Sequence, residues 1–188
     1  MTAQDGGESM EEFSYIVLDL EWNQPMSGQE TITRPFRFDS EIIEIGALKL
    51  NNRFEEMSEF KSFVRPVFYP AMNGHVVQLT KIRPQELEKA PDFPTAYAAF
   101  RDWCGEDCAF VTWGCDDVSV LQQNVDFFRV ERPLPKMYDL QRLYAAEAGK
   151  SGQTALKTAM EALGVEVDEE RSFHNAMHDA YYTCLLYT

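Results

Sequence analysis

Two acidic side chains lie at the end of an apolar segment near the start of the chain. Residues 14–22 read SYIVLDLEW, which places Asp19 and Glu21 directly after apolar residues. Alternate residues of a strand share a face, so both carboxylates point the same way while Leu20 points into the core. Charged carboxylates are costly beside apolar residues unless a cation neutralises them. The pair therefore predicts a metal site, with a solvated strand end as the ordinary alternative.

A second acidic group follows a short apolar segment in the middle of the chain. Residues 111–117 read VTWGCDD, and this pattern predicts a strand that leads through Gly114 into a helix. Either Asp116 or Asp117 could cap that helix with its side chain. Two adjacent aspartates exceed what a cap requires, so one of them is expected to turn into the site.

The third group is a histidine with an aspartate five residues later, His174 and Asp179. On a helix this offset separates two side chains by roughly 140°. Both can face one site only if His174 lies in the loop or first turn and Asp179 on the helix proper. The alternative pair, His174 with His178, has a spacing that suits zinc, but no third ligand is obvious. We expect His178 to be exposed, or to lie near the metal ligands without binding the metal itself.

The length of 188 residues suits one domain with a substantial core. Residues 1–12 predict a disordered acidic tail, and residues 13–188 a single domain. No apolar run reaches the roughly 18 residues needed to cross a bilayer, and the start lacks the layout of a signal peptide. The four cysteines have no Cys-x-x-Cys spacing, which favours a reducing cytoplasm over a disulfide framework.

The formal charge of −14, from 17 basic and 31 acidic residues, argues on its face against a nucleic-acid partner. The first twelve residues contribute part of that charge, and bound divalent cations would cancel more. A local basic rim could still form. The acidity predicts weak, salt-sensitive binding and a short footprint on any nucleic acid. The candidate rim residues are Lys61, Arg65, Lys81, Arg83, Arg129, Arg132, Lys136 and Arg142.

The order of apolar patterns predicts an α/β fold in which strands come first and strand–helix units follow. The first three strands should form an antiparallel meander, and the whole sheet should be a five-stranded mixed sheet flanked by helices. Polar loops are expected at 23–40, near the site, and from 66 to 74. The expected strands are 14–20, 41–50, 53–65, 109–113 and 137–140, and the expected helices are 93–103, 118–128, 141–148, 154–163 and 174–187.

The three acidic groups, in this order and on these elements, resemble the DEDDh-type 3′–5′ exonucleases, which are DnaQ-like members of the ribonuclease-H-like superfamily. The resemblance runs from Tyr15 to Tyr187. Residues 79–82, LTKI, resemble the Leu-Thr-Gly-Ile segment of the family, with Lys81 in place of the glycine. Details such as DLEW and WG are most similar to the branch of small-RNA and histone-mRNA 3′ exonucleases and bacterial sporulation-inhibitor-type relatives.

The resemblance implies a role for each motif residue. It makes His174 the general base and favours Asp117 over Asp116, because the family places its aspartate at the last position of this stretch. Two Mg²⁺ ions, with Mn²⁺ as a substitute, would be the cofactors. The metal-binding carboxylates would be Asp19, Glu21, Asp117 and Asp179, and the substrate contacts would be Leu20, Trp22, Leu79 and Thr80.

The implied activity is hydrolysis of single-stranded RNA or DNA from its 3′ end to nucleoside 5′-monophosphates. Two alternatives stay open at this point. One is an oligoribonuclease-like phosphodiesterase that acts on very short oligonucleotides, which the low basicity favours. The other is a module on the same fold that binds nucleic acid or protein without turnover. No membrane association and no particular protein partner are indicated.

Overall fold

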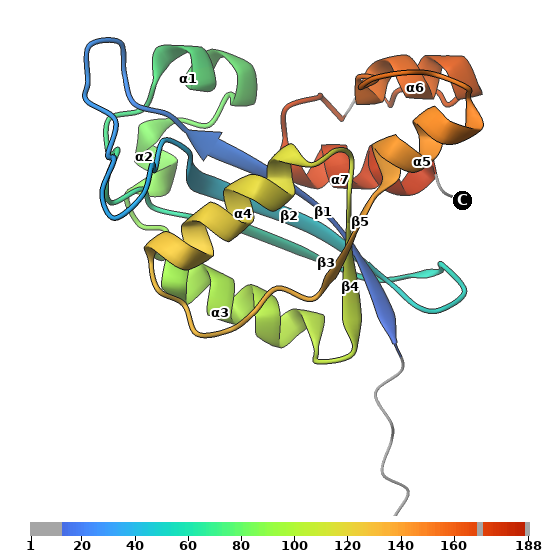
Figure 1. The fold of residues 1–188 in the computed structure, drawn as a ribbon, viewed down its shortest axis with the longest axis horizontal. Coiled ribbons are helices and arrows are strands. Elements are labelled where there is room, and N and C mark those ends of the chain that lie inside the picture. Colours follow the sequence, from blue (N-terminus) through green and yellow to red (C-terminus); the bar gives the residue numbers. More distant parts are fainter. Residues whose placement is uncertain (1–12, 169–170, 187–188) are drawn as a thin grey trace, which may run out of the picture.

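The structure is a computed structural model, and it describes residues 13–168 and 171–186. Five strands form one mixed sheet in the order β3-β2-β1-β4-β5 (Figure 1). Strand β1 pairs antiparallel with β2 and parallel with β4, while β2–β3 is antiparallel and β4–β5 parallel. This arrangement confirms the predicted meander and mixed sheet. The strands are Ser14–Asn23, Glu41–Leu50, Glu56–Phe63, Cys108–Thr112 and Lys136–Asp139. The predicted acidic tail, 1–12, lies outside the described residues.

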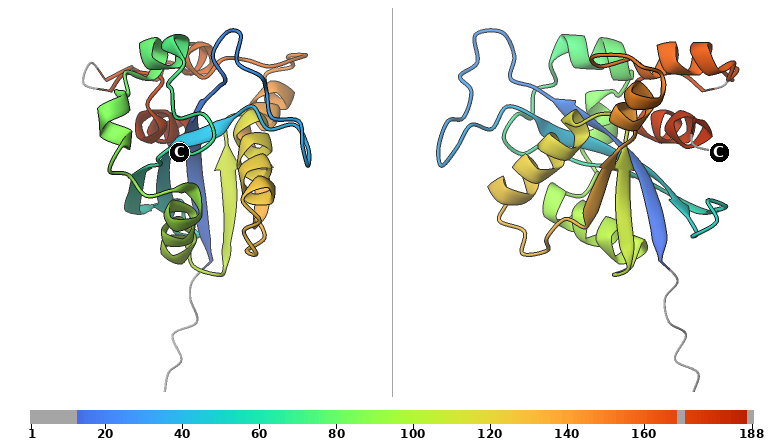
Figure 2. Two further views of the ribbon diagram at one scale, coloured as in Figure 1. Left: turned by 90° about the vertical axis from the view of Figure 1, so that its left-hand side faces the viewer. Right: turned by 45° about the vertical axis from the view of Figure 1, so that its right-hand side comes forward.

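Helices cover both faces of the sheet (Figures 1 and 2). Helices α3 and α4 pack on one face, where their apolar side chains form the main core with residues such as Ile16, Leu18 and Leu20. Helix α7 packs on the other face, where Met177 and Cys184 meet Val17. The helices are Gly74–Thr80 (α1), Pro84–Leu87 (α2), Phe93–Cys104 (α3), Asp116–Phe127 (α4), Leu140–Glu147 (α5), Leu156–Leu163 (α6) and Ala176–Leu185 (α7).

Several element ends differ from the sequence prediction. Strand β3 begins at Glu56 rather than at Arg53, because Asn51 Oδ1 accepts hydrogen bonds from the Arg53 and Glu55 amides and tightens the turn. Helix α4 begins two residues before the predicted position. The last helix begins at Ala176, so His174 precedes it.

Helices α1 and α2 are absent from the sequence prediction. Asn73 caps α1 by accepting a hydrogen bond from the His75 amide at 3.0 Å. The helix ends after seven residues at Lys81, whose φ of 61° is left-handed. A helix this short shows little periodicity, so its pattern resembles that of a loop. Lys81 thus adopts the conformation that a glycine at this position would favour.

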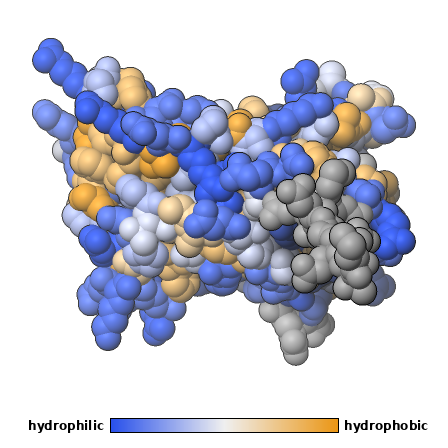
Figure 3. All heavy atoms as spheres, turned by 90° about the horizontal axis from the view of Figure 1, so that it is seen from below, coloured by the Kyte–Doolittle hydropathy of each residue, from blue (hydrophilic) through white to orange (hydrophobic). Residues whose placement is uncertain are grey.

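Within residues 13–168 and 171–186, no helix is both long enough and apolar enough to cross a membrane. Seen from below, the surface is largely hydrophilic, and its largest apolar area lies at the left of the view, with smaller ones elsewhere (Figure 3).

Candidate active site

A cavity of about 400 Å³ opens at the carboxyl end of β1. Asp19 and Glu21 point into it from the strand face that Val17 shares with α7. Because β1 and β4 run parallel, the helix that follows β4 begins at the same edge of the sheet. The cavity is lined by Asp19, Leu20, Glu21, Trp22, Gln24, His75, Val76, Leu79, Thr80, Trp113, Asp116, Asp117, His174 and Asp179.

The two adjacent aspartates at the start of α4 have different environments. Asp117 is 6 % exposed, and its Oδ1 accepts a hydrogen bond of 3.0 Å from the Leu20 amide of β1. Asp116 is exposed and lies on the cavity wall. The residue before α4 is Cys115, which makes no side-chain cap. Burial and the bond to β1 therefore separate Asp117 from Asp116.

The backbone before α7 brings His174 and Asp179 to the same cavity. His174 has a left-handed φ of 62°, and its amide donates to Asp179 Oδ2 at 2.9 Å. One ligand atom each of Glu21, His174 and Asp179 lies within 4.8 Å of the others. His174 lies in the loop before α7 and Asp179 lies on the helix, which is one of the two placements that allow both to face one site. The ring Nδ1 of His178 instead lies 3.1 Å from the Ser172 carbonyl oxygen.

The pKa values of all four carboxylates are raised, in each case mainly by burial. Burial, together with the charges of Asp117, Asp179 and Glu21, raises the pKa of Asp19 well above its usual range. Burial and the same kind of repulsion raise the pKa of Glu21 to about 8. Burial also raises the pKa of Asp117 to about 7 and that of Asp179 to about 6. Such a group is costly to ionise without a bound cation.

The donor set suits hard divalent cations. Asp179 Oδ1 is buried and has no hydrogen-bond partner among the described residues. An oxygen in that state is normally satisfied by water or an ion. Carboxylate oxygens are the ligands that Mg²⁺ and Mn²⁺ prefer. Asp19, Glu21 and Asp179 are thus available to hold metal ions directly.

The sequence matches the family model described as Exonuclease over residues 16–187. The chain belongs to this exonuclease family. It is 28 % identical over 169 residues to the probable 3′–5′ exonuclease KapD of Bacillus subtilis (strain 168), covering 89 % of this chain and 79 % of that protein. The order of its motif residues is the one expected of a DEDDh-type 3′–5′ exonuclease.

Solved structures share the fold of this exonuclease. The nuclease domain of 3′hExo, a DEDDh family member bound to rAMP, has a TM-score of 0.78 at 21 % identity, covering 95 % of this chain and 91 % of that one. A 3′-exonuclease that recognises the 3′ end of histone mRNA stem-loop also has a TM-score of 0.78 at 21 % identity. This match covers 94 % of the present chain and 63 % of that longer chain.

The four residues predicted to contact substrate all line the cavity of the exonuclease. Leu79 is 38 % exposed and Trp22 half-buried, whereas Leu20 is 2 % exposed and belongs to the core. The Thr80 hydroxyl donates to the Val76 carbonyl oxygen and accepts from the Ile82 amide. Thr80 therefore has limited capacity for a further hydrogen bond.

Other residues of the site escaped the sequence reasoning. Gln24 and His75 line the cavity and belong to none of the acidic motifs, and Trp113 lies within residues 111–117 but was assigned no role there. Glu44 is fully buried on β2, directly opposite Glu21 in the register of β1 and β2. Glu44 is the one charged residue within the apolar segment 42–48, and this was the indication available in the sequence.

Proposed function

We propose that this exonuclease is metal-dependent and hydrolyses single-stranded RNA or DNA from the 3′ end, releasing nucleoside 5′-monophosphates. The observation that supports this best is the convergence of Asp19, Glu21, Asp117, Asp179 and His174 on one cavity. The carboxylates come from three elements far apart in sequence, and their raised pKa values indicate a site built for cations.

Asp19, Glu21 and Asp179 would hold two Mg²⁺ ions, with Mn²⁺ as a substitute. Asp117 would act through water, because its Oδ1 already accepts the Leu20 amide. When bound, such a pair of ions activates the attacking water and neutralises charge on the phosphoryl and leaving oxygens.

His174 would act as the general base. Its imidazole is exposed at the cavity, and its backbone is held by Asp179. The ring accepts a proton from the attacking water as the new P–O bond forms. The bond between phosphorus and the 3′ oxygen of the preceding nucleotide breaks. The products are a nucleoside 5′-monophosphate and a strand shortened by one nucleotide with a free 3′ hydroxyl.

The apolar walls of the cavity would receive the terminal nucleotide. Trp22 and Leu79 present partly exposed apolar surface beside the carboxylates. Stacking of a base on an aromatic side chain is worth about 1–3 kcal/mol and tolerates any sequence. One structural neighbour recognises a histone mRNA stem-loop, and another, exonuclease I of E. coli, forms a complex with single-stranded DNA, which supports including both polymers in the proposal.

Short oligonucleotides are the second candidate substrate class. Several of the cations considered for a basic rim are engaged in ion pairs. Lys61 pairs with Glu44, Arg83 with Glu86, and Arg132 with Asp102 and Glu106. The described residues that line the cavity include no lysine and no arginine. A site without cations of its own gains little from a long phosphate backbone, which favours substrates of only a few nucleotides.

The test is degradation of 5′-labelled single-stranded RNA and DNA of matched sequence, from dinucleotides to 20-mers. Each is incubated with Mg²⁺, Mn²⁺ or chelator, beside the Asp19→Ala protein. A metal-dependent ladder that shortens from the 3′ end and is lost in the variant is the expected result. Turnover confined to the shortest substrates would establish the oligonucleotide phosphodiesterase. Metal-indifferent binding without cleavage of any length would instead indicate a non-catalytic module.

A further inference from the structure

A fifth carboxylate lies behind the proposed metal site and has no part in the mechanism above. Glu44 of β2 is 0 % exposed and faces Glu21 across the β1–β2 pair. Two carboxylates directly opposite each other destabilise a sheet, and a fully buried carboxylate is expensive on its own. Glu44 therefore needs compensating partners, and the structure provides one for each of its two oxygens.

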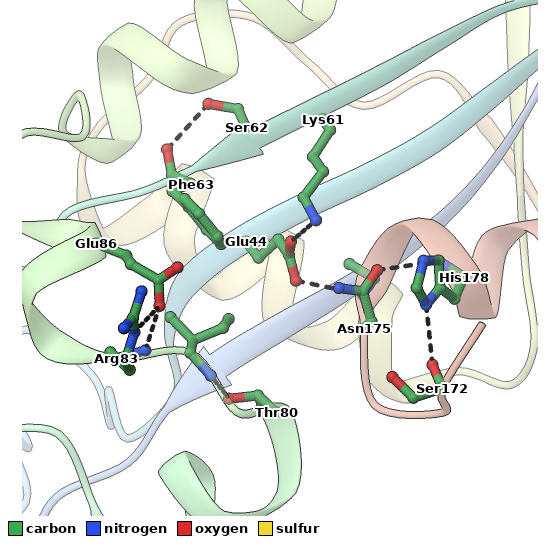
Figure 4. A network of polar contacts seen from close by, with 12 residues as sticks. Glu44, Lys61, Ser62, Phe63, Thr80, Arg83, Glu86, Ser172, Asn175 and His178 are labelled. Atoms are coloured by element: carbon green, nitrogen blue, oxygen red, sulfur yellow. Dashed lines mark hydrogen bonds and ion pairs between the residues drawn. The ribbon is translucent and has the colours of Figure 1, made fainter. Parts of the chain in front are cut away.

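The first partner is a cation from the neighbouring strand. Lys61 lies opposite Gly46 in the β2–β3 register, and its Nζ is 2.9 Å from Glu44 Oε1. The lysine side chain is 43 % exposed and that of the glutamate 0 %, so the ion pair runs from the surface inward. Figure 4 shows Glu44 between Lys61 and the turn that carries Asn175. The ion pair fixes the orientation of the buried carboxylate.

The second partner is the free amide at the start of α7. Glu44 Oε2 accepts a hydrogen bond of 3.3 Å from the backbone N–H of Ala176, the first residue of the helix. Amides in the first turn have no partner within their own helix, and a negative charge at this end also favours the helix dipole. Asn175 satisfies another of these amides, that of His178, at 3.2 Å.

The backbone at the start of α7 also contacts β2 directly at Gly46, the next residue after Glu44 on the same face of the strand. A Cβ at Gly46 would lie 2.2 Å from the Met177 nitrogen and 2.3 Å from the Ala176 carbonyl carbon. No side chain fits there without moving the helix, so the backbone of α7 rests directly on the strand. Leu48, two residues further along, packs against Met177 in the same cluster. Glu44, Gly46 and Leu48 together form a seat for the start of α7.

We propose that Glu44 is a positioning residue for the nuclease reaction: it holds the backbone at Ala176 so that His174 and Asp179 meet Asp19 and Glu21. The inference rests on the proposed function for its catalytic consequence, but the seat itself is a property of the fold. His174 lies two residues before the bonded amide and Asp179 three residues after it. A shift of this turn would displace the proposed base and one metal ligand together.

The test compares Glu44→Ala and Glu44→Gln with Glu41→Gln as a matched control. Glu41 lies on the same strand, is 1 % exposed, and also accepts backbone amides, from Val67, Phe68 and Tyr69. Glu41 bonds the loop at 67–69 and not the start of α7, so Glu41→Gln reports the general cost of altering a buried carboxylate on β2. Amide hydrogen exchange, Mn²⁺ affinity, kcat and KM are measured for each protein.

In Glu44→Ala we expect the amides of 176–179 to exchange about 10-fold faster. Mn²⁺ should bind about 10-fold more weakly and kcat should fall about 10–100-fold, the range for residues that orient metal ligands, while KM changes less than about 2-fold. Glu44→Gln keeps one oxygen for Ala176 but loses the ion pair, so its values should lie between those of Glu44→Ala and the wild type. If Glu44→Ala does not fold, the same measurements on Glu44→Gln and Glu41→Gln decide whether Glu44 positions the start of α7.

Unchanged exchange at 176–179 in both Glu44 variants would overturn the proposal, as would equal acceleration in Glu41→Gln. Unchanged kcat and Mn²⁺ affinity despite faster exchange would also overturn the positioning role. A wild-type protein that cleaves no nucleic acid would contradict the proposed function instead, and the exchange data would still show whether the seat exists.

Discussion

At the scale of single residues, two adjacent aspartates differ in burial and in hydrogen bonding. Asp117 is buried and bonded to the Leu20 amide, and burial raises its pKa to about 7. Asp116 is exposed on the cavity wall. One hydrogen bond across 97 residues of chain thus distinguishes a proposed ligand from its neighbour.

We expect Asp117→Asn to lower kcat by at least 100-fold, because the amide removes a negative charge that the metal site needs. Asp116→Asn, at the adjacent exposed position, should change kcat less than about 3-fold. Single-turnover cleavage of labelled RNA at saturating Mg²⁺ measures both. Comparable losses in the two variants would contradict the assignment of Asp117.

Trp22 belongs to the residue scale as well, because its ring is half-buried beside Glu21. Replacing it with alanine should raise KM by about 5–150-fold, the equivalent of losing about 1–3 kcal/mol of base stacking. Trp22→Phe, which keeps an aromatic face, should recover most of that affinity. Steady-state kinetics on a short oligonucleotide, with thermal unfolding as the control for folding, checks this. An unchanged KM in Trp22→Ala would remove the residue from the substrate site.

At the scale of elements, the site depends on how closely α7 approaches the sheet. The helix contributes Asp179, and the residues before it contribute His174. Gly46 permits the close approach, and Glu44 bonds the first amide of the helix. Helix α1 forms the opposite wall with His75, Leu79 and Thr80, although its seven residues have little helical periodicity. The placement of these two helices determines the width of the cavity.

Gly46→Ala should therefore destabilise the protein strongly, although it adds only one methyl group. Its Cβ would lie 2.2 Å from the Met177 backbone, so we expect a loss of about 3 kcal/mol in the free energy of unfolding. Activity should fall as well. Gly74→Ala is the control, because a Cβ there meets nothing within 4 Å. Urea unfolding of both variants measures the difference, and equal stabilities would show that α7 can move away at little cost.

At the scale of the whole molecule, acidic residues outnumber basic ones, and four of them meet where the proposed cations would bind. The formal charge of the chain is −14, and four carboxylates meet in a single cavity. Their raised pKa values mean that the folded protein retains protons which the unfolded chain releases. Without metal, the site therefore opposes folding at neutral pH, and bound cations would reverse that effect.

The sign of the pH dependence follows from Glu21, whose pKa rises from 4.5 to about 8 on folding. Between these two values the folded state binds more protons than the unfolded state, so stability falls as the pH rises. The melting temperature of the chelated protein should fall between pH 5.5 and 8.5, and Mg²⁺ should raise it more at pH 8.5. Calorimetry checks both statements. Glu21→Gln should flatten the decline, and an equally steep decline in that variant would contradict this origin.

Local pattern was sufficient for much of this protein. Alternation along β1 placed Asp19 and Glu21 on one face, and the spacing of His174 and Asp179 required the histidine to lie in the loop or the first turn of the helix. The structure agrees on both points. These properties follow from the sequence because they depend on the geometry of one strand or one helix start. The order of the acidic motifs was likewise readable along the chain.

Tertiary structure decided the rest. It selected Asp117 through the Leu20 amide, folded α1 into a wall of the cavity, and placed Glu44 under the start of α7. Each of these outcomes depends on contacts between residues far apart in the chain, such as the 132 residues that separate Glu44 and Ala176. Burial and long-range hydrogen bonds depend on which elements pack together, and no single segment of sequence contains that information.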